Sequence, residues 1–396
     1  MPSLIFRRGL ALRDAVAGTL NADYHSALVE RVKAQGYEHT DGRLTVHLAR
    51  EFGFCYGVDR AVDYAYQARH RFPDRPIYVT GEIIHNPHVN GKLRALGIRI
   101  LGDAVQGLDR LRPSDVVILP AFGVTADLLA RLEATGCTLI DTTCGSVLNV
   151  WKTVRRYAQD GFTAVIHGKV HHEETRATAS QAQQYPGGRF LIVLTRDEAA
   201  LVADYIRHGG DRAAFMARFG EAASPGFDPD RDLGRVGLAN QTTMLMSESL
   251  AIEEVFREAM RDRYGERELD GRFRAFETIC SATEDRQQAV VTLLRDCRLD
   301  LMVVIGGYNS SNTRNLARIC ASGLPTFHIA DAECLVSADE IRQRPVGGSA
   351  ETATRGWLPH GGAVAVGLTA GASTPDVIVG QVIERLGHFA NAGRPR

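Results

Sequence analysis

The stretch EFGFCYGVDRAV, residues 51–62, places a cysteine between two glycines where one apolar pattern changes into another. Before it, RLTVHLA (43–49) has the β-branched, apolar character of a buried strand. After it, Val58, Ala61, Val62 and Ala65 recur at the spacing of one helix face. The stretch therefore predicts a strand-to-helix turn that presents Cys55 at a helix N-terminus, where negative charge is stabilised.

Runs like the one before Cys55 recur along the chain and alternate with helical patterns. Buried strands separated by amphipathic helices are typical of α/β layers with mostly parallel sheets. We therefore expect an α/β protein, with an N-terminal extension before residue 46 and an inserted loop near 207–235. The further runs are DVVILPA (115–121), CTLIDTT (137–143), FTAVIHG (162–168), RFLIVLT (189–195), LDLMVVIGG (299–307) and GAVAVGLT (362–369).

Length and charge exclude several classes of protein. A chain of 396 residues predicts two or three domains, at about 150 residues for each domain. The formal net charge of -1 gives no basic excess for nucleic acid or for a membrane surface. No run approaches the roughly 18 apolar residues of a membrane helix, and the first residues lack a long apolar signal segment. We predict a cytoplasmic protein without nucleic-acid or membrane partners.

Three of the seven cysteines share one setting. Cys144 in DTTCGS and Cys280 in ETICSAT, like Cys55, follow an apolar run and open a helical pattern. They are too far apart for a local zinc knuckle, but three thiolates suit a soft metal or an iron–sulfur cluster. Spacing alone leaves three core cysteines as an alternative. We interpret the other four as structural, because buried cysteine behaves as a small hydrophobe: Cys137, Cys297, Cys320 and Cys334.

Two segments have the pattern of an anion site. In GGYNSSNTRNLARIC (306–320), two serines and an asparagine follow a strand and precede a helix. In TAGASTPD (369–376), Ser373 and Thr374 are predicted at an N-cap with Pro375 at the first helical position. Plain helix capping is the alternative for each segment.

Further polar clusters could bind phosphate or move a proton. GEIIHNPHVN (81–90) offers His85 and His88, and VIHGKVHHEETRAT (165–178) offers His167 and a pair of histidines beside two glutamates. ANQTTM (239–244) could fix a hydroxyl or a water. A solvated loop or helix start is the alternative for the HHEE segment.

In chain order, these motifs resemble the LytB/IspH family of 4-hydroxy-3-methylbut-2-enyl diphosphate reductases. The matching set is GFCYGVDRAV, EIIHNP, DTTC, HEET, NQTTM, TICSAT, NSSNT and TAGASTPD, and it covers roughly residues 45 to 385. LPAFG, FDPD and GWLP resemble the long cyanobacterial and plastid subgroup.

The resemblance implies three pseudo-equivalent α/β domains arranged as a trefoil around a central [4Fe–4S] cluster. Cys55, Cys144 and Cys280 fall on the family's three ligand positions and leave one iron open for substrate. The expected divisions are an extension (1–45), domain 1 (46–143), domain 2 (144–278), domain 3 (279–385) and a C-terminal tail (386–396).

The resemblance also implies a reaction and the residues that carry it. A small-molecule diphosphate would be reductively dehydroxylated to isopentenyl and dimethylallyl diphosphate, with two electrons from ferredoxin or flavodoxin passing through the cluster. Glu174 would deliver protons and Thr242 would hold the hydroxyl or a water. The diphosphate would bind His85, His172, Ser310, Ser311, Asn312 and Ser373. In the His171–His172 pair, the HEE pattern selects His172.

Two positions depart from the family pattern. Phe122 in PAFG stands where many members have a histidine that contacts the diphosphate, and Gly145 stands where proline often follows the cysteine. Two other function classes stay open. One is a cluster-containing sensor, which would need the cysteines but not Glu174. The other is a zinc or thiol hydrolase, which would differ from an iron–sulfur reductase in metal content and colour.

Overall fold

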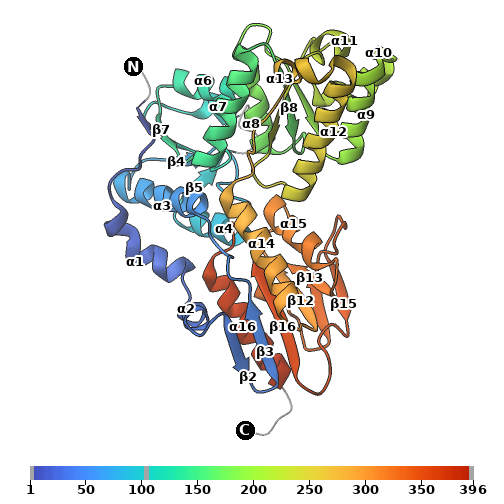
Figure 1. The fold of residues 1–396 in the computed structure, drawn as a ribbon. Coiled ribbons are helices and arrows are strands. Elements are labelled where there is room, and N and C mark those ends of the chain that lie inside the picture. Colours follow the sequence, from blue (N-terminus) through green and yellow to red (C-terminus); the bar gives the residue numbers. More distant parts are fainter. Residues whose placement is uncertain (1–3, 102–106, 392–396) are drawn as a thin grey trace. The chain divides into compact units, whose positions relative to one another are not determined.

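The computed structural model describes residues 4–101 and 107–391 (Figure 1). The chain divides into two compact units. Unit 1 comprises Met1–Arg8, Tyr78–Gly81 and Ile100–Cys280, and unit 2 comprises Gly9–Ile77, Glu82–Arg99 and Ser281–Arg396. Among the described residues, no helix is both long and apolar enough to cross a membrane.

Unit 2 is built on a five-stranded sheet with the order β13-β12-β16-β3-β2, in which only β2 is antiparallel to its neighbour. Alternate residues of β12 face two different cores. Leu301, Val303 and Ile305 pack in the same core as α16, whereas Met302 and Val304 pack with α14 and α15. Unit 2 therefore has a helix–sheet–helix layering, as parallel sheets require. Its strands are β2 (Glu38–Asp41), β3 (Leu44–Leu48), β12 (Leu301–Ile305), β13 (Thr326–Ile329) and β16 (Val364–Ala370).

Helices and one small hairpin complete unit 2. The extension forms α1 and α2, and α1 packs on α3. The hairpin pairs β14 with β15. The elements are α1 (Arg13–Tyr24), α2 (Ala27–Ala34), α3 (Tyr56–Arg71), α4 (Pro87–Ala95), α14 (Ser281–Asp296), α15 (Ser311–Cys320), η4 (Ala332–Cys334), β14 (Glu340–Gln343), β15 (Thr352–Arg355) and α16 (Asp376–Asn391).

Unit 1 contains a four-stranded parallel sheet with the order β11-β10-β8-β9. Val165 of β8 packs in one core with α9 and α12, and its neighbour Ala164 packs in another core with α7. This sheet is thus also covered on both faces. Its strands and helices are α7 (Gly145–Gln159), β8 (Thr163–His167), α8 (Glu173–Ala182), β9 (Phe190–Val193), α9 (Arg196–His208), β10 (Val236–Asn240), α12 (Met246–Tyr264) and β11 (Phe273–Ala275), with short elements α10 (Arg212–Phe219), η2 (Gly220–Ala222), α11 (Pro229–Asp232), η3 (Glu266–Glu268) and α13 (Leu269–Arg272).

A second sheet has the order β1-β7-β6-β4-β5. The boundary between the two units falls within β4, between Ile77 and Tyr78, and within β5, between Arg99 and Ile100. Strand β6 pairs in parallel with β7, and both pack against α6 through Leu132. The elements are β1 (Ile5–Phe6), β4 (Ile77–Val79), β5 (Ile98–Ile100), η1 (Leu108–Arg110), β6 (Val116–Leu119), α6 (Ala126–Ala134) and β7 (Thr138–Asp141).

The structure confirms the predicted α/β class and each of the seven predicted strands. Among the described residues, three α/β sheets contain parallel strand pairs. The predicted domain boundaries stay a prediction, to which the pairings add one fact: β3 lies in the sheet of β12 and β16. Residues 392–396 of the predicted tail lie outside the described residues.

The prediction of an inserted loop near 207–235 is wrong. This segment forms α10, η2 and α11, and Phe215, Phe219 and Phe227 are buried in the core of α9 and α12. The spacing of Phe215 and Phe219 is that of one helix face, a signal that the glycines and charged residues of the segment obscured.

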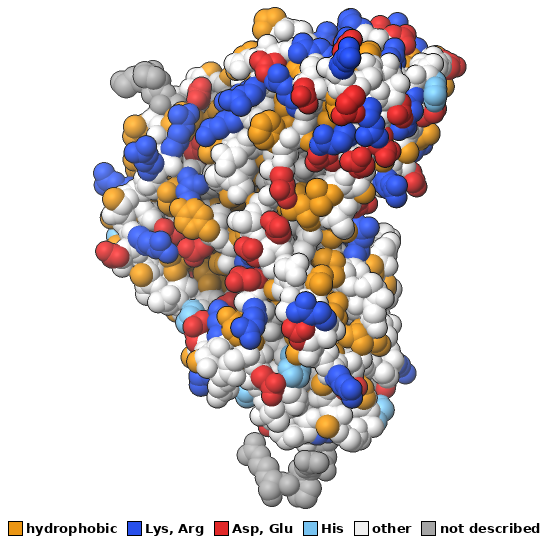
Figure 2. All heavy atoms as spheres, in the orientation of Figure 1, with side chains coloured by type: hydrophobic (Ala, Val, Ile, Leu, Met, Phe, Trp, Pro, Cys, Tyr) orange, Lys and Arg blue, Asp and Glu red, His pale blue; other side chains and the backbone are white. Residues whose placement is uncertain are grey.

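Charged side chains of both signs are interspersed on the face of unit 1 that Figure 2 shows around α9 and α12. Many of them form ion pairs. Arg207 lies 2.7 Å from Asp262, and Arg257 lies 2.5 Å from Glu253. On this face, the surface charge matches the balanced composition of the chain.

Candidate functional site

The residues predicted from sequence lie in both units, and each unit assembles its own set. Unit 1 holds Cys144, His172, Glu174, Thr242 and Cys280. Unit 2 holds Cys55, His85, Ser310, Ser311, Asn312 and Ser373.

Each of the three predicted ligand cysteines directly precedes a helix. Cys55 is the N-cap of α3, Cys144 is the N-cap of α7, and Cys280 precedes Ser281, the first residue of α14. All three are partly exposed. The prediction that they stand at strand-to-helix turns is confirmed, and the helix N-terminus favours a thiolate at each position.

The other cysteines lie in different settings. Cys137, Cys320 and Cys334 are buried, and Cys297 is partly exposed just beyond the end of α14. Burial raises the pKa of Cys320 to about 12, so this thiol stays protonated at neutral pH. These positions fit the structural role predicted for them.

In unit 1, the backbone of Thr242 connects a carboxylate to a cysteine. Its N–H donates to Glu174 Oε1 at 2.6 Å, and its carbonyl accepts from the Cys280 N–H at 3.2 Å. Glu174 is almost completely buried, with 1% of its surface exposed. The geometry thus places the predicted proton donor and a predicted cluster ligand on either side of one peptide residue.

Gln241 holds the segment that carries Thr242. Its Oε1 accepts from the Lys169 N–H at 3.2 Å and from Thr175 Oγ1 at 3.1 Å, and its Nε2 donates to Thr243 Oγ1 at 2.9 Å. The side chain of Gln241 therefore supports the structure of the polar segment 239–244.

The two adjacent histidines of unit 1 have different surroundings. His172 is buried and is the N-cap of α8, where its Nδ1 accepts from the Glu174 N–H at 3.2 Å. His171 is exposed, and its Nε2 lies 3.7 Å from Glu221. The buried position beside Glu174 supports the choice of His172 made from sequence.

In unit 2, glycines let three segments approach closely. A Cβ on Gly307 would lie 2.5 Å from the His85 carbonyl oxygen, and one on Gly371 would overlap the Thr313 side chain. Gly53, with φ +75°, brings the chain past Asp376 just before Cys55. Because the loops around His85, Ser310 and Ser373 converge, only glycine fits at these positions.

Ala372 connects the predicted anion site to Cys55. Its N–H donates to Asn312 Oδ1 at 2.9 Å, and its carbonyl accepts from the Cys55 N–H at 3.1 Å. Asn312 is 2% exposed, and among the described residues its buried Nδ2 has no hydrogen-bond partner. A buried amide donor without a partner is costly, which points to a ligand that accepts from it.

The remaining anion-site residues of unit 2 are fixed by hydrogen bonds. Ser310 is the N-cap of α15 and its Oγ accepts from the Thr313 N–H. His85 Nδ1 lies 2.8 Å from Glu82 Oε2. A carboxylate accepts hydrogen bonds, so this contact orients the imidazole through Nδ1.

The expected capping by Ser373 and Thr374 is wrong. Helix α16 begins at Asp376, and the two hydroxyls donate to the carbonyls of His85 (3.3 Å) and Ile305 (3.1 Å). These bonds join the segment after β16 to the segments after β12 and before α4. The hydroxyl protons of both residues are therefore used in tertiary hydrogen bonds, and the helix begins two residues after Thr374.

Sequence reasoning missed two supporting residues. Glu82 fixes His85, and the buried Arg286 donates from Nη2 to the Gly53 carbonyl at 2.8 Å. A carboxylate three residues before a histidine was a readable signal for Glu82. Nothing in the sequence connects Arg286 to a glycine more than two hundred residues away.

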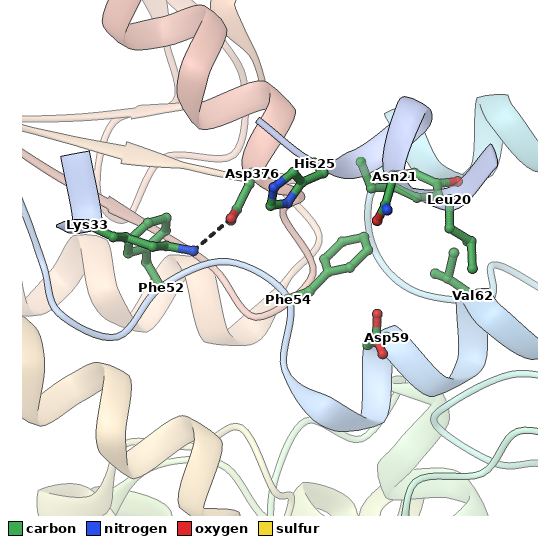
Figure 3. Close-up of a pocket in the computed structure, with 10 residues that line it drawn as sticks. Leu20, Asn21, His25, Lys33, Phe52, Phe54, Asp59, Val62 and Asp376 are labelled. Carbon is green, nitrogen blue, oxygen red and sulfur yellow. Dashed lines mark hydrogen bonds and ion pairs between the residues drawn. The ribbon is translucent and has the colours of Figure 1, made fainter. Parts of the chain in front are cut away.

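A pocket of about 240 Å³ in unit 2 lies beside the segment that leads to Cys55 (Figure 3). Phe52, Phe54 and Asp59 line it, together with extension residues such as His25. Burial, and secondarily the nearby Asp63, raises the pKa of Asp59, although Arg13 opposes the shift. Lys33 of the extension pairs with Asp376 at 2.8 Å. Residues of the extension thus line the same pocket as the segment that leads to Cys55.

The donor set fits a cluster held by thiolates. The three partly exposed cysteines stand at helix N-termini, and no oxygen or imidazole ligand is needed to complete a three-thiolate set. Unit 1 also holds a buried carboxylic acid, and unit 2 holds an anion cradle. A carboxylic acid can deliver a proton, and the cradle can bind a phosphate group.

Comparison with known proteins agrees with this chemistry. The model of the LytB protein family matches residues 46–387. The chain is 49% identical over 395 residues to the 4-hydroxy-3-methylbut-2-enyl diphosphate reductase of Gloeobacter violaceus, covering 98% of this chain and 93% of that protein. It is 46% identical over 383 residues to the reductase of the same name from Thermosynechococcus vestitus, covering 96% and 93%.

A solved structure of (E)-4-hydroxy-3-methyl-but-2-enyl diphosphate reductase, titled as the terminal enzyme of the non-mevalonate pathway, has a similar fold. The TM-score is 0.52 at 28% identity, covering 86% of this chain and 98% of that one. The two named relatives are cyanobacterial, which confirms the subgroup that the long motifs predicted.

Proposed function

Because this chain belongs to the LytB family, we propose that it reduces (E)-4-hydroxy-3-methylbut-2-enyl diphosphate to isopentenyl diphosphate and dimethylallyl diphosphate. The reaction breaks the C–O bond of the substrate hydroxyl. It consumes two electrons and two protons and releases one water. The chain is accordingly an oxidoreductase of isoprenoid biosynthesis.

The main support from the structure for a diphosphate substrate is the buried Nδ2 of Asn312, which has no hydrogen-bond partner among the described residues. Its amide oxygen is fixed by the Ala372 N–H, so its NH₂ group faces away from that bond. The N-terminus of α15 lies in the same segment and favours negative charge. A diphosphate oxygen supplies the acceptor that this donor lacks.

The other diphosphate contacts in this proposal are His85, His172, Ser310, Ser311 and Ser373. Glu82 orients His85 at Nδ1, and His85 Nε2 contacts a phosphate oxygen. Serine hydroxyls adapt as donors to phosphate oxygens. In this proposal, imidazole, amide and hydroxyl groups share the phosphate oxygens as hydrogen-bond donors.

Glu174 is the proton donor in this proposal. Its carboxyl group is buried, and the Thr242 N–H donates to one of its two oxygens and so fixes its position. Thr242 is placed to hold the substrate hydroxyl or the water that leaves. The Thr242 backbone is hydrogen-bonded to both Glu174 and Cys280, so it fixes the position of the acid relative to this cysteine.

Cys55, Cys144 and Cys280 would hold a [4Fe–4S] cluster with one iron open. When bound, such a cluster supplies electrons one at a time at a potential that its surroundings tune. A small electron-transfer protein, ferredoxin or flavodoxin, is the proposed electron donor.

The first experiment is anaerobic purification with iron, sulfide, zinc and visible or EPR analysis. Oxidation of dithionite-reduced methyl viologen is then followed when the substrate is added. The expected result is about four irons per chain with substrate-dependent oxidation. A cluster without turnover would indicate a sensor, and zinc without iron would refute the three-thiolate assignment.

Asn312→Ala tests the substrate site directly. Loss of the buried donor is expected to weaken diphosphate binding about 10- to 100-fold, since a hydrogen bond to a charged group contributes about 1.5–3 kcal/mol. Asn149→Ala, at an exposed position on α7, is the matched control and should leave binding unchanged. Equal binding by both variants would show that Asn312 does not face the substrate.

A further inference from the structure

The hydrogen bond at Nδ1 determines which ring nitrogen of His172 can donate a proton. Its Nδ1 accepts the Glu174 N–H at the start of α8, so Nδ1 carries no proton. The neutral ring then has its single N–H on Nε2. A helix N-terminus also disfavours a cation at this position. As long as the cap is formed, His172 is therefore a donor from Nε2 only.

The cap by itself does not fix the ring plane. The torsion of a histidine about its Cβ–Cγ bond is broad and roughly two-fold. A half-turn of the ring would break the bond to the Glu174 N–H and turn Nε2 away from its original direction. The cap bond therefore favours one orientation, and a contact against the ring plane would hold it more firmly.

Phe122 supplies that contact. Its ring centroid lies 5.5 Å from that of His172 with an interplanar angle of 80°, an edge-to-face geometry. Both residues belong to unit 1.

Phe122 itself sits on a rigid turn. The Gly123 N–H donates to the Pro120 carbonyl at 2.9 Å, and Gly123 has φ +74°. A Cβ at Gly123 would overlap the ring of Trp151. The residue before Phe122, Ala121, accepts from the Cys144 N–H at 3.0 Å. The turn is thus held by Trp151 on one side and by the Cys144 segment on the other.

We propose that Phe122 is a positioning residue for diphosphate binding, which holds the His172 imidazole so that its Nε2–H donates to a phosphate oxygen. A phenyl ring offers no hydrogen bond to phosphate, so Phe122 acts through His172. The identity of the ligand rests on the proposed function. The two contacts that support the ring orientation, the bond from the Glu174 N–H and the Phe122 ring, both lie in unit 1.

A double-mutant cycle on the holoenzyme tests this role, with inorganic diphosphate as the probe and calorimetry as the measurement. Phe122→Ala is expected to weaken diphosphate binding about 3- to 10-fold, the effect of losing one aromatic edge-to-face contact. Phe122→Tyr keeps the ring and should restore binding to within about two-fold. In a His172→Gln background, Phe122→Ala should have no further effect.

Phe276→Ala is the matched control, because Phe276 is a half-exposed phenylalanine of unit 1 that contacts Tyr157. It should leave diphosphate binding unchanged. Thermal unfolding of every variant separates a loss of folding from a loss of binding.

Three results would overturn the proposal: unchanged binding in Phe122→Ala, an equal loss in the His172→Gln background, or no diphosphate binding by the parent protein. Turnover is measured separately with methyl viologen and the substrate. If the cycle behaves as expected but no turnover occurs, Phe122 still positions His172 and the proposed function fails instead.

Discussion

Gly307→Ala should damage the substrate site through a single methyl group. The new Cβ would lie 2.5 Å from the His85 carbonyl oxygen. Gly307 is not among the glycines with positive φ, so its backbone conformation suits alanine and the effect is purely steric. The oxygen belongs to the backbone and cannot rotate away as a side chain would.

The size of the effect follows from that overlap. Ordinary Cβ contacts begin near 3.4 Å, so the His85 segment must move by close to 1 Å. Overpacking of this kind costs about 1–3 kcal/mol. The same movement stretches the bond from Ser373 Oγ to the His85 carbonyl. A displacement of about 1 Å in a positioning group lowers activity by up to about 100-fold.

The assay combines thermal unfolding with KM and kcat for methyl viologen oxidation. Gly307→Ala should lower the unfolding midpoint and raise KM at least about 10-fold. Gly91→Ala is the control, because Gly91 lies inside α4 with nothing within 4 Å of its would-be Cβ. That variant should be stabilised by about 0.5–1 kcal/mol with unchanged KM. Normal KM in Gly307→Ala would refute the close approach of these loops.

Three more outcomes are expected. Glu174→Gln should keep cluster content and diphosphate binding but lower turnover by about 100-fold or more, and normal turnover would remove Glu174 from proton delivery. Burial lowers the pKa of His328 to about 4 from 6.5, so the unfolded chain takes up the proton first. Stability should therefore be unaffected above about pH 6.5 and fall by about 3 kcal/mol between pH 6.5 and 4. Urea unfolding across this range should show that the fall is smaller in His328→Phe, and an equal fall would contradict the assignment. Tyr24→Phe removes the 3.0 Å bond to Tyr66 but keeps the ring against Phe54, and should cost about 1 kcal/mol, whereas Tyr24→Ala should cost about 3–5 kcal/mol. Similar unfolding midpoints for the two variants would show that the extension does not pack on the Cys55 segment.

Many strands and helix starts could be predicted from the sequence because they depend on local residue patterns. β-Branched runs mark strands buried on both faces, and each of the predicted runs became a parallel strand. The helix after Cys55 begins at Tyr56, two residues before the apolar periodicity that starts at Val58. Short or weakly apolar strands such as β4 and β11, and the helices of 207–235, were missed because their patterns are brief or interrupted.

The sequence by itself determined which chemical groups are available: three cysteines at helix starts, a glutamate beside a histidine, and serine-rich turns after strands. These features are local, since a helix start and a strand end are set by neighbouring residues. Only the tertiary structure decided how those groups are held. The Ala372 link between Asn312 and Cys55 joins segments far apart in sequence, as does the Thr242 link between Glu174 and Cys280. Such contacts depend on which loops the packed sheets bring together, and one-dimensional spacing does not contain that information.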